Sequence, residues 1–484
     1  MIKLKTVVQQ LTPEDYQTIE EQFQKNRADK FRALLSHLRQ PELSEKEIYS
    51  KLTLNKAAYY TLKSRLYEKI QEYLFVNVKD PRIELIRNVS NIPNLLFNTP
   101  KDTAIALLKK LEKKLIEYDM PNELTQVYSA LKKLHLSSPK YFEYAQLYNK
   151  HVAYTIGLDK AEDLLSRFAK SLGEYKASRN VSETEVLDLM RMEMSNLYQL
   201  YESHHLAIYR NIMDISFSIY IPFKRKAGDS LLIEKMLDDS RKIFEENPRD
   251  ATYKYLTTVV DFLTFEYYHK SGQMKLSTPY FEKVNTDLNI FILADHCCFT
   301  ANFLTSKLER YALLGIGEEL EEEDICLENA IRKEDAPSYL CYGIYKAGTS
   351  FYAKKYGDAI SSLQAVLNEL SFKNMIHAEL EAKLFLALNY CLIGRRSESE
   401  VVLKNILRKL RERKEDDYKN VTAFVKLLSV KSTSDIASLE LQLQKLAERF
   451  VQQNDKDPQR MLKFIVLDKA MISLLAKAFK KEKN

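Results

Sequence analysis

The chain has 484 residues, which is too many for one compact core, so several domains or an array of repeats is expected. Only 10 Gly and 12 Pro interrupt a sequence that is 45% apolar and 29% charged, which favours long amphipathic helices and leaves few turn residues for a mainly β fold. The 73 basic and 67 acidic residues leave a net charge of only +6, so composition disfavours a dedicated nucleic-acid-binding protein.

The N-terminal residues 1–80 have the pattern of a separate trihelical unit. The helices that we expect are 14–39, 45–52 and one that begins at 56. Ser44 and Glu47 form a capping box, because the Ser44 hydroxyl can accept from the amide of Glu47 while the Glu47 carboxylate reaches back. Asn55 is placed to cap the third helix.

Part of this unit resembles the helix-turn-helix of DNA-binding proteins, with small or apolar side chains at Ile48, Leu52, Leu54, Ala58 and Tyr59. The resemblance implies that the second helix faces a DNA major groove with Lys56, Tyr60, Lys63 and Ser64. Thr53 replaces the frequent turn glycine, Lys63 stands where a buried aliphatic side chain is usual, and no winged hairpin follows Tyr73. A helical cap packed against the rest of the chain is therefore our first expectation, and DNA contact is the alternative.

Beyond residue 80 the sequence predicts two halves of one helical array. In the first half, 81–220, helices of roughly 15 to 20 residues are expected from 81 to about 179, between breaks that contain Pro or Gly, and a long helical stretch is expected from 182 on. Pro, Gly and charged residues cluster at 221–230, which predicts a loop, and residues 231–484 continue the array.

The C-terminal end of the array has the pattern of capping helices. Apolar residues at 436–450 alternate at spacings of three and four, which predicts one helix. Asp457 and Pro458 are expected to open a last apolar helix that includes Phe464 and covers the end of the array.

Residues 338–411 contain two successive units with matching residues, namely Ala347, Tyr356, Ala359, Leu363 and Val366 in the first and Ala387, Tyr390, Gly394, Ser399, Leu403 and Ile406 in the second. The pattern resembles the tetratricopeptide repeat, in which small residues let two helices approach closely. Equivalent alanines lie 40 residues apart (387 − 347), against about 34 in the standard repeat, so we expect an extended second helix. The resemblance implies an all-α, right-handed α-solenoid of about ten antiparallel helix pairs with a concave groove.

In such a solenoid the first helix of each pair lines the concave face. The resemblance therefore implies that a partner contacts the helices near 339–354 and 376–393. The positions expected to be exposed there and to bind the partner are Tyr345, Lys346, Ser350, Lys383 and Asn389. Tyr, Lys and Asn side chains can hold a peptide backbone or an acidic side chain, so a protein or peptide partner is expected.

Sequence motifs for catalysis, cofactors or metals are not found. The chain has no Gly-rich phosphate loop and no Gly-x-Ser-x-Gly elbow. His204–His205 and Asp295–Cys298 gather metal-binding residue types, but neighbouring helical residues point about 100° apart and do not easily clamp one ion. We expect no catalytic residue, no cofactor and no metal, and therefore no enzyme.

The expected location is the cytoplasm. The first residues lack the apolar core of a signal peptide, and no stretch approaches the ~20 uncharged residues of a membrane span. Five Cys without framework spacing predict reduced thiols.

The expected function is a non-enzymatic scaffold that binds a protein or peptide in a helical-repeat groove. The alternative is a transcriptional or signalling regulator whose N-terminal unit contacts DNA and whose repeats sense a partner.

Overall fold

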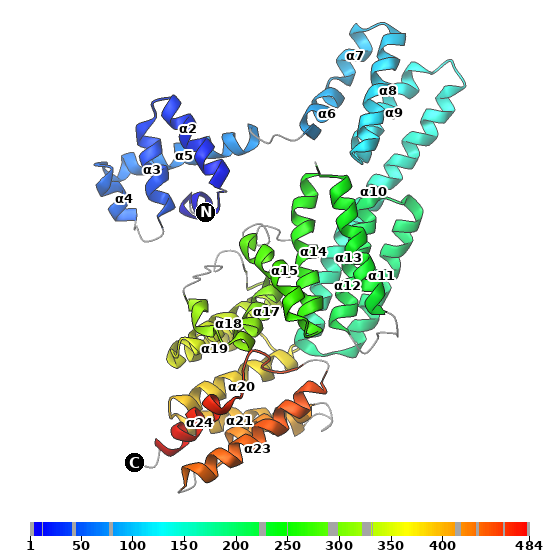
Figure 1. Ribbon diagram of the computed structural model, residues 1–484. Coiled ribbons are helices and arrows are strands. Elements are labelled where there is room, and N and C mark those ends of the chain that lie inside the picture. The colour runs from blue at the N-terminus through cyan, green and yellow to red at the C-terminus, as the bar shows by residue number, and fades with distance from the viewer. Residues whose placement is uncertain are drawn as a thin grey trace. The chain divides into compact units, whose positions relative to one another are not determined.

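The computed structural model describes residues 4–11, 13–40, 45–76, 81–221, 229–248, 250–288, 299–321, 331, 333–411, 418–431, 435–457 and 460–481. All regular structure in these residues is helical, as the composition predicts, and they contain no strand (Figure 1). The chain divides into two compact units, unit 1 (Met1–Tyr148) and unit 2 (Asn149–Asn484). The long helix α10 (Lys140–Ser178) contains the boundary between them.

Unit 1 has two separate clusters of buried side chains. Its helices are α1 (Leu4–Gln10), α2 (Pro13–Lys25), α3 (Asp29–Arg39), α4 (Glu45–Lys51), α5 (Lys56–Val76), α6 (Pro81–Ser90), α7 (Ile92–Asn98), α8 (Lys101–Glu117), α9 (Pro121–Leu134) and the start of α10. The first cluster extends from Leu4 to Tyr73 and the second from Leu85 to Tyr144. Residues up to 76 therefore have an apolar core of their own.

The single helix expected over 14–39 is wrong, because two helices, α2 and α3, replace it. Arg27 adopts a φ of 51°, in the left-handed region that ends a right-handed helix, and the amide of Ala28 donates to the Phe23 carbonyl at 2.8 Å. The reversal brings the Phe31 ring against the Phe23 ring, with centroids 5.6 Å apart. The sequence pattern also missed α1, which packs against α3.

The turn between α4 and α5 has the backbone conformation that favours glycine. Thr53 has a φ of 53°, although a β-branched residue is strained there by about 1–2 kcal/mol. The expected cap of α5 is confirmed, because Asn55 Oδ1 accepts from the Ala58 amide at 2.8 Å. Ser44 lies outside the described residues, so the expected capping box is not tested.

Unit 2 is a succession of helices, most of which pack against a neighbour in the chain (Figure 1). After α10 they are α11 (Val181–Tyr201), α12 (His204–Tyr220), α13 (Asp229–Glu246), α14 (Ala251–Lys270), α15 (Met274–Thr286), α17 (Phe299–Leu314), the 3₁₀ helix η2 (Gly317–Glu321), α18 (Ala336–Tyr352), α19 (Tyr356–Glu369), α20 (Ile376–Leu392), α21 (Arg396–Arg411), α22 (Lys419–Leu428), α23 (Ile436–Asp455) and α24 (Lys469–Lys481). Some helices also contact the helix after the next one in the chain: α12 contacts α14, and α20 contacts α22. One apolar cluster runs through the whole unit. The loop expected at 221–230 lies mostly outside the described residues.

The two repeat-like units correspond to the helix pairs α18–α19 and α20–α21. The small residues expected at the close contacts, Ala347, Ala359, Ala387 and Ser399, are all buried, as predicted. The Ser399 hydroxyl donates to the Ala387 carbonyl at 3.1 Å, so this small polar residue also joins the two helices of its pair. Gly394 makes the turn between them with a φ of 79°.

The last helix does not open at Asp457–Pro458, as expected, but at Lys469. Residues 460–468 are not helical, and Leu462 has a left-handed φ of 48°. Met461, Leu462, Phe464 and Ile465 are all buried. Near-consecutive residues of a surface helix would point in different directions, so burying all four favours an irregular segment held by its surroundings.

Glycines on α18 permit its close approach to both neighbouring helices. A Cβ atom at Gly343 would overlap the Val366 side chain of α19, and one at Gly348 would overlap Leu308 of α17. At Gly357, on α19, an added Cβ would meet no atom within 4 Å. α18 therefore needs glycine for packing at two positions, whereas α19 has space at Gly357.

We predict that Gly343→Ala lowers the free energy of unfolding by about 1–3 kcal/mol, because overpacking outweighs the gain in helix propensity. Gly357→Ala is the matched control and should leave stability unchanged or higher. Thermal and urea denaturation of both variants measure the difference. Equal stability of the two variants would show that α18 and α19 do not approach as closely as described.

Candidate ligand-binding site

A cavity of about 300 Å³, the small cavity hereafter, lies inside unit 2. Its walls come from α10, α12, α14, α17, α18, α20 and the segment 460–464. Small side chains open this space where the helices meet, among them Gly173, Ala177, Ala301, Ser338 and Ala378. Helices that are distant in the sequence thus share one concave surface.

Charged side chains line the small cavity, although most of the surrounding core is apolar. The basic ones are Lys176, Lys270, Arg460 and Lys463, and the acidic ones are Glu266, Glu309 and Glu381. Lys176 Nζ lies 4.7 Å and Lys270 Nζ 3.7 Å from the centroid of the Tyr220 ring. Two ammonium groups from different helices therefore share one aromatic ring.

Glu266 links the residues around Tyr220. Its Oε2 atom lies 3.1 Å from Lys270 Nζ and accepts from the Tyr220 hydroxyl at 3.0 Å. Burial by itself would raise the pKa of Glu266, but the Lys270 charge and a hydrogen bond from Ser306 lower it to about 2. Glu266 is consequently ionised at neutral pH.

Lys270 is in the opposite situation. Burial lowers its pKa to about 7; Glu266 opposes this effect, while Lys463 and Lys176 add to it. Its side chain is 26% exposed, at the rim of the cavity, so water still reaches it. Lys270 can therefore gain or lose a proton near neutral pH.

Three buried polar atoms on the wall have no hydrogen-bond partner among the described residues. They are Glu266 Oε1 on α14, the Ser338 hydroxyl on α18 and His377 Nδ1 on α20. Burial, with the charges of Arg179 and Lys463, lowers the pKa of His377 to about 3, so the ring is neutral. Buried polar groups are normally paired, and a bound ligand can supply the missing partners.

The segment 460–468 covers part of the small cavity and is held mainly through its backbone. The amide of Leu462 donates to Glu381 Oε1 at 2.7 Å, and the carbonyl of Phe464 accepts from the Tyr352 hydroxyl at 2.5 Å. Asn454 bonds both the amide and the carbonyl of Met461 at 2.8 Å. The helices of unit 2 thus bind an irregular stretch of polypeptide by side chain to backbone contacts.

A larger cavity of about 1140 Å³ adjoins the small one. Pro337 lines both cavities, and the walls of the larger one come mainly from the end of α10, the segments before α18 and α20, and Tyr418. Charged side chains of both signs line it, the basic ones being Lys170, Arg179 and Lys373 and the acidic ones Glu174, Glu183, Glu334 and Asp335. The two cavities differ in size, and charged side chains line both of them.

The residues that we expected to bind a partner do not line either cavity. Tyr345 and Asn389 are buried, so the expectation that they are exposed is wrong. α18 and α20 are covered by helices on several sides, and Asn389 Nδ2 donates back to the Phe385 carbonyl at 2.8 Å. Lys346 is exposed, Ser350 is half-buried, and Lys383 is paired with Glu379 at 2.7 Å. A binding role of these three stays a prediction.

Sequence reasoning missed the residues of the small cavity. A usable signal was present on α14, where Glu266 and Lys270 interrupt a strongly apolar stretch one turn apart. On a surface helix such a pair is ordinary, so only its apolar context marked it as unusual.

The four candidate DNA-contacting residues, Lys56, Tyr60, Lys63 and Ser64, lie on α5. Their spacing places them on one face of the helix, and all but the half-buried Lys63 are exposed. The adjacent face of the helix buries Tyr59, Leu66 and Ile70 in the core of unit 1, and Lys63 Nζ lies 6.0 Å from the centroid of the Tyr59 ring. DNA contact by these four side chains stays a prediction.

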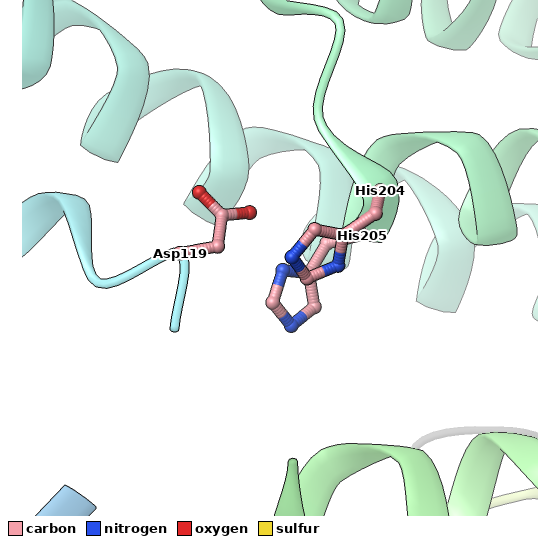
Figure 2. A group of neighbouring side chains, drawn as sticks. All are labelled: Asp119, His204 and His205. Carbon is pink, nitrogen blue, oxygen red and sulfur yellow. The ribbon is translucent and has the colours of Figure 1, made fainter. Parts of the chain in front are cut away.

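The two adjacent histidines lie side by side at the start of α12 (Figure 2). Their ring centroids are 4.5 Å apart; His205 Nε2 lies 2.9 Å from an oxygen of Asp250, and His204 Nδ1 contacts the Tyr253 hydroxyl. These protein partners account for the positions of the rings. Asp119, also labelled in Figure 2, belongs to unit 1 and is not counted with this pair.

The cysteines lie in several different places in the chain. Asp295, His296, Cys297 and Cys298 lie outside the described residues. Cys391 is buried near the Ser399 hydroxyl, and Cys341 lines the small cavity, where burial raises the pKa of its thiol.

Among the described helices, none combines the length and apolar composition that a membrane crossing requires.

Comparisons with known proteins identify no relative. No protein-family model matches the chain, and no curated protein or solved structure matches it either.

We predict that His377 makes unit 2 sensitive to acid. The folded-state pKa of about 3 lies below the ordinary value, so the unfolded chain binds the extra proton first and stability falls as pH drops below about 6.5. Between pH 6.5 and 5, wild type should lose up to about 1.4 kcal/mol per pH unit more than His377→Gln. Urea denaturation across this range measures the difference, and parallel curves would rule out a buried neutral His377.

Proposed function

We propose that the protein is a non-enzymatic binding protein whose unit 2 holds an extended protein or peptide segment beside α18 and α20. In this proposal unit 2 is a right-handed, tetratricopeptide-like solenoid, and the larger cavity is part of its groove. The observation that carries the proposal is the segment 460–468, which unit 2 already holds in a non-helical form.

The contacts to this segment are of the kind that bind peptides in general. Glu381 and Tyr352 bond backbone groups, which every sequence offers, and the Phe385 ring meets the Phe464 ring with centroids 5.1 Å apart. The larger cavity adds about 1140 Å³ of space next to these helices, with side chains of both charges on its wall. An extended segment with polar side chains suits such a surface.

Binding is favoured over catalysis by the state of the groups at the small cavity. A reactive cysteine needs a lowered pKa, whereas burial raises the pKa of Cys341. Glu266 and Lys270 are paired with each other, and the lowered pKa of Glu266 keeps its carboxylate ionised at neutral pH. Perturbed pKa values mark sites of function in general, and binding sites are among them.

Peptides that bind the wild-type protein can be selected from a random displayed library. We predict that these peptides bind the Ser371→Trp variant about tenfold more weakly than they bind the wild type. Ser371 is exposed and lines the larger cavity, so a bulky ring there obstructs the cavity without disturbing the core. Ser361→Trp, an exposed change on α19 away from both cavities, is the control. Fluorescence anisotropy measures the affinities.

Failure to select any peptide would contradict the proposal. Equal affinity of both variants would place the binding surface elsewhere on the chain.

A second candidate function, DNA contact by α5, is favoured by the geometry of α4, the turn and α5. Thr53 adopts the left-handed conformation of the glycine usual in helix-turn-helix turns, and Asn55 caps the second helix. Lys56, Tyr60, Lys63 and Ser64 share one face of α5. With unit 2 sensing a partner, this arrangement suits a transcriptional or signalling regulator.

We predict that wild type shifts random-sequence duplex DNA in a gel at roughly 50 mM salt and much less at roughly 200 mM. Lys56→Ala with Lys63→Ala should weaken binding and reduce the salt slope by about 0.9 for each lysine that neutralises a phosphate in the wild type. Lys25→Ala with Lys30→Ala, at exposed positions on α2 and α3, is the control of equal charge. No shift at low salt, or equal weakening by both pairs, would exclude DNA contact by α5.

A further inference from the structure

The small cavity brings together lysines from three distant parts of unit 2. Lys176 comes from α10, Lys270 from α14 and Lys463 from the segment between α23 and α24. Lys176 and Lys270 both lie over the Tyr220 ring, and the Lys463 charge acts on Lys270, His377 and Glu381. The three lysines belong to different elements, so only the tertiary packing of unit 2 brings them together.

The acidic side chains of the same cavity are already engaged. Glu266 pairs with Lys270 and accepts from Tyr220, and Glu309 lies 3.4 Å from an Arg460 nitrogen and 3.9 Å from His269 Nε2. Glu381 accepts from the Leu462 amide, and burial raises its pKa. Lys463 forms no ion pair with any described residue. Four basic side chains thus meet three carboxylates around the cavity, and one of the four, Lys463, has no carboxylate partner of its own.

Partly buried positive charge is unfavourable unless an anion or water compensates it. An anion between Lys176, Lys270 and Lys463 would supply the compensation, and it would also reach polar atoms that lack a partner on the same wall, above all the Ser338 hydroxyl. A dianion is less suitable, because Glu266, Glu309 and Glu381 line the cavity and repel a second negative charge.

We propose that the small cavity is a binding site for a small organic monocarboxylate, whose carboxylate is held by Lys176, Lys270 and Lys463. A volume of about 300 Å³ is at the lower end of the range for small-molecule sites, so a ligand of few carbon atoms fits. The small cavity differs in this from the larger one, which has room for a polypeptide segment. The proposal is independent of peptide binding at the larger cavity.

The first test is isothermal titration of the full chain with propionate, pyruvate, lactate and benzoate, with phosphate and sulfate as anion controls at constant ionic strength. We expect at least one monocarboxylate to bind and to raise the melting temperature, and phosphate and sulfate to bind less tightly. Lys463→Met and Lys270→Met should each weaken binding about tenfold. Lys254→Met, at an exposed position on α14, should not.

Proton uptake gives a readout that a merely structural lysine would not change. Lys270 faces Glu266, Lys176 and Lys463, and its pKa of about 7 means that it is largely neutral at pH 8. A carboxylate bound beside it should raise that pKa, so binding at pH 8 should take up protons. Titrations in buffers of different ionisation enthalpy measure the uptake, which Lys270→Met should abolish.

Four outcomes would overturn the proposal: no binding by any monocarboxylate, tighter binding of phosphate or sulfate, affinity unchanged in both lysine variants, or binding at pH 8 without proton uptake. Competition by peptides with a free C-terminal carboxylate, but not by their amides, would assign the carboxylate to a peptide and overturn the choice of a free ligand. Because Lys463 lies on an irregular segment, its variant tests the site even if Lys270→Met fails to fold.

Discussion

Close packing between consecutive helices is the constraint on which unit 2 depends. An amphipathic helix of 13 to 20 residues, such as α15 or α14, has little stability alone and must bury its apolar face against neighbours. In α18 this burial occurs on two sides, and glycines at 343 and 348 allow contact with α19 and α17. Backbones that approach so closely leave room only for small side chains, which explains the buried alanines of the repeat-like pairs.

The same constraint explains the small cavity. Where six helices converge, small residues such as Gly173, Ala301 and Ala378 cannot fill the space between them. Lysines and glutamates reach into the remaining volume, with their charges partly balanced by one another and by the Tyr220 ring. Keeping charged groups in an otherwise apolar region lowers stability, which is one reason why we propose a ligand site there.

The segment 460–468 links the cavity to the end of the chain. It contributes Arg460 and Lys463 to the wall, and its position depends on α18 through Tyr352 and on α20 through Glu381. Because Asn454 of α23 holds the start of the segment, the C-terminal helices also influence the cavity. A ligand that contacts Lys463 would therefore interact with α10, α14 and the C-terminal region at once.

The sequence alone determined the helical class, the two close-packed pairs at 338–411 and the cap at Asn55, because these depend on spacings within a few helical turns. It did not determine the break between α2 and α3 or the irregular course of 460–468, where tertiary contacts outweigh helical periodicity. Nor did it show that Lys176, Lys270 and Lys463 meet, or that Tyr345 and Asn389 are buried. Local spacing decides which residues share a helix face, but the packing of helices far apart in the chain decides what that face meets.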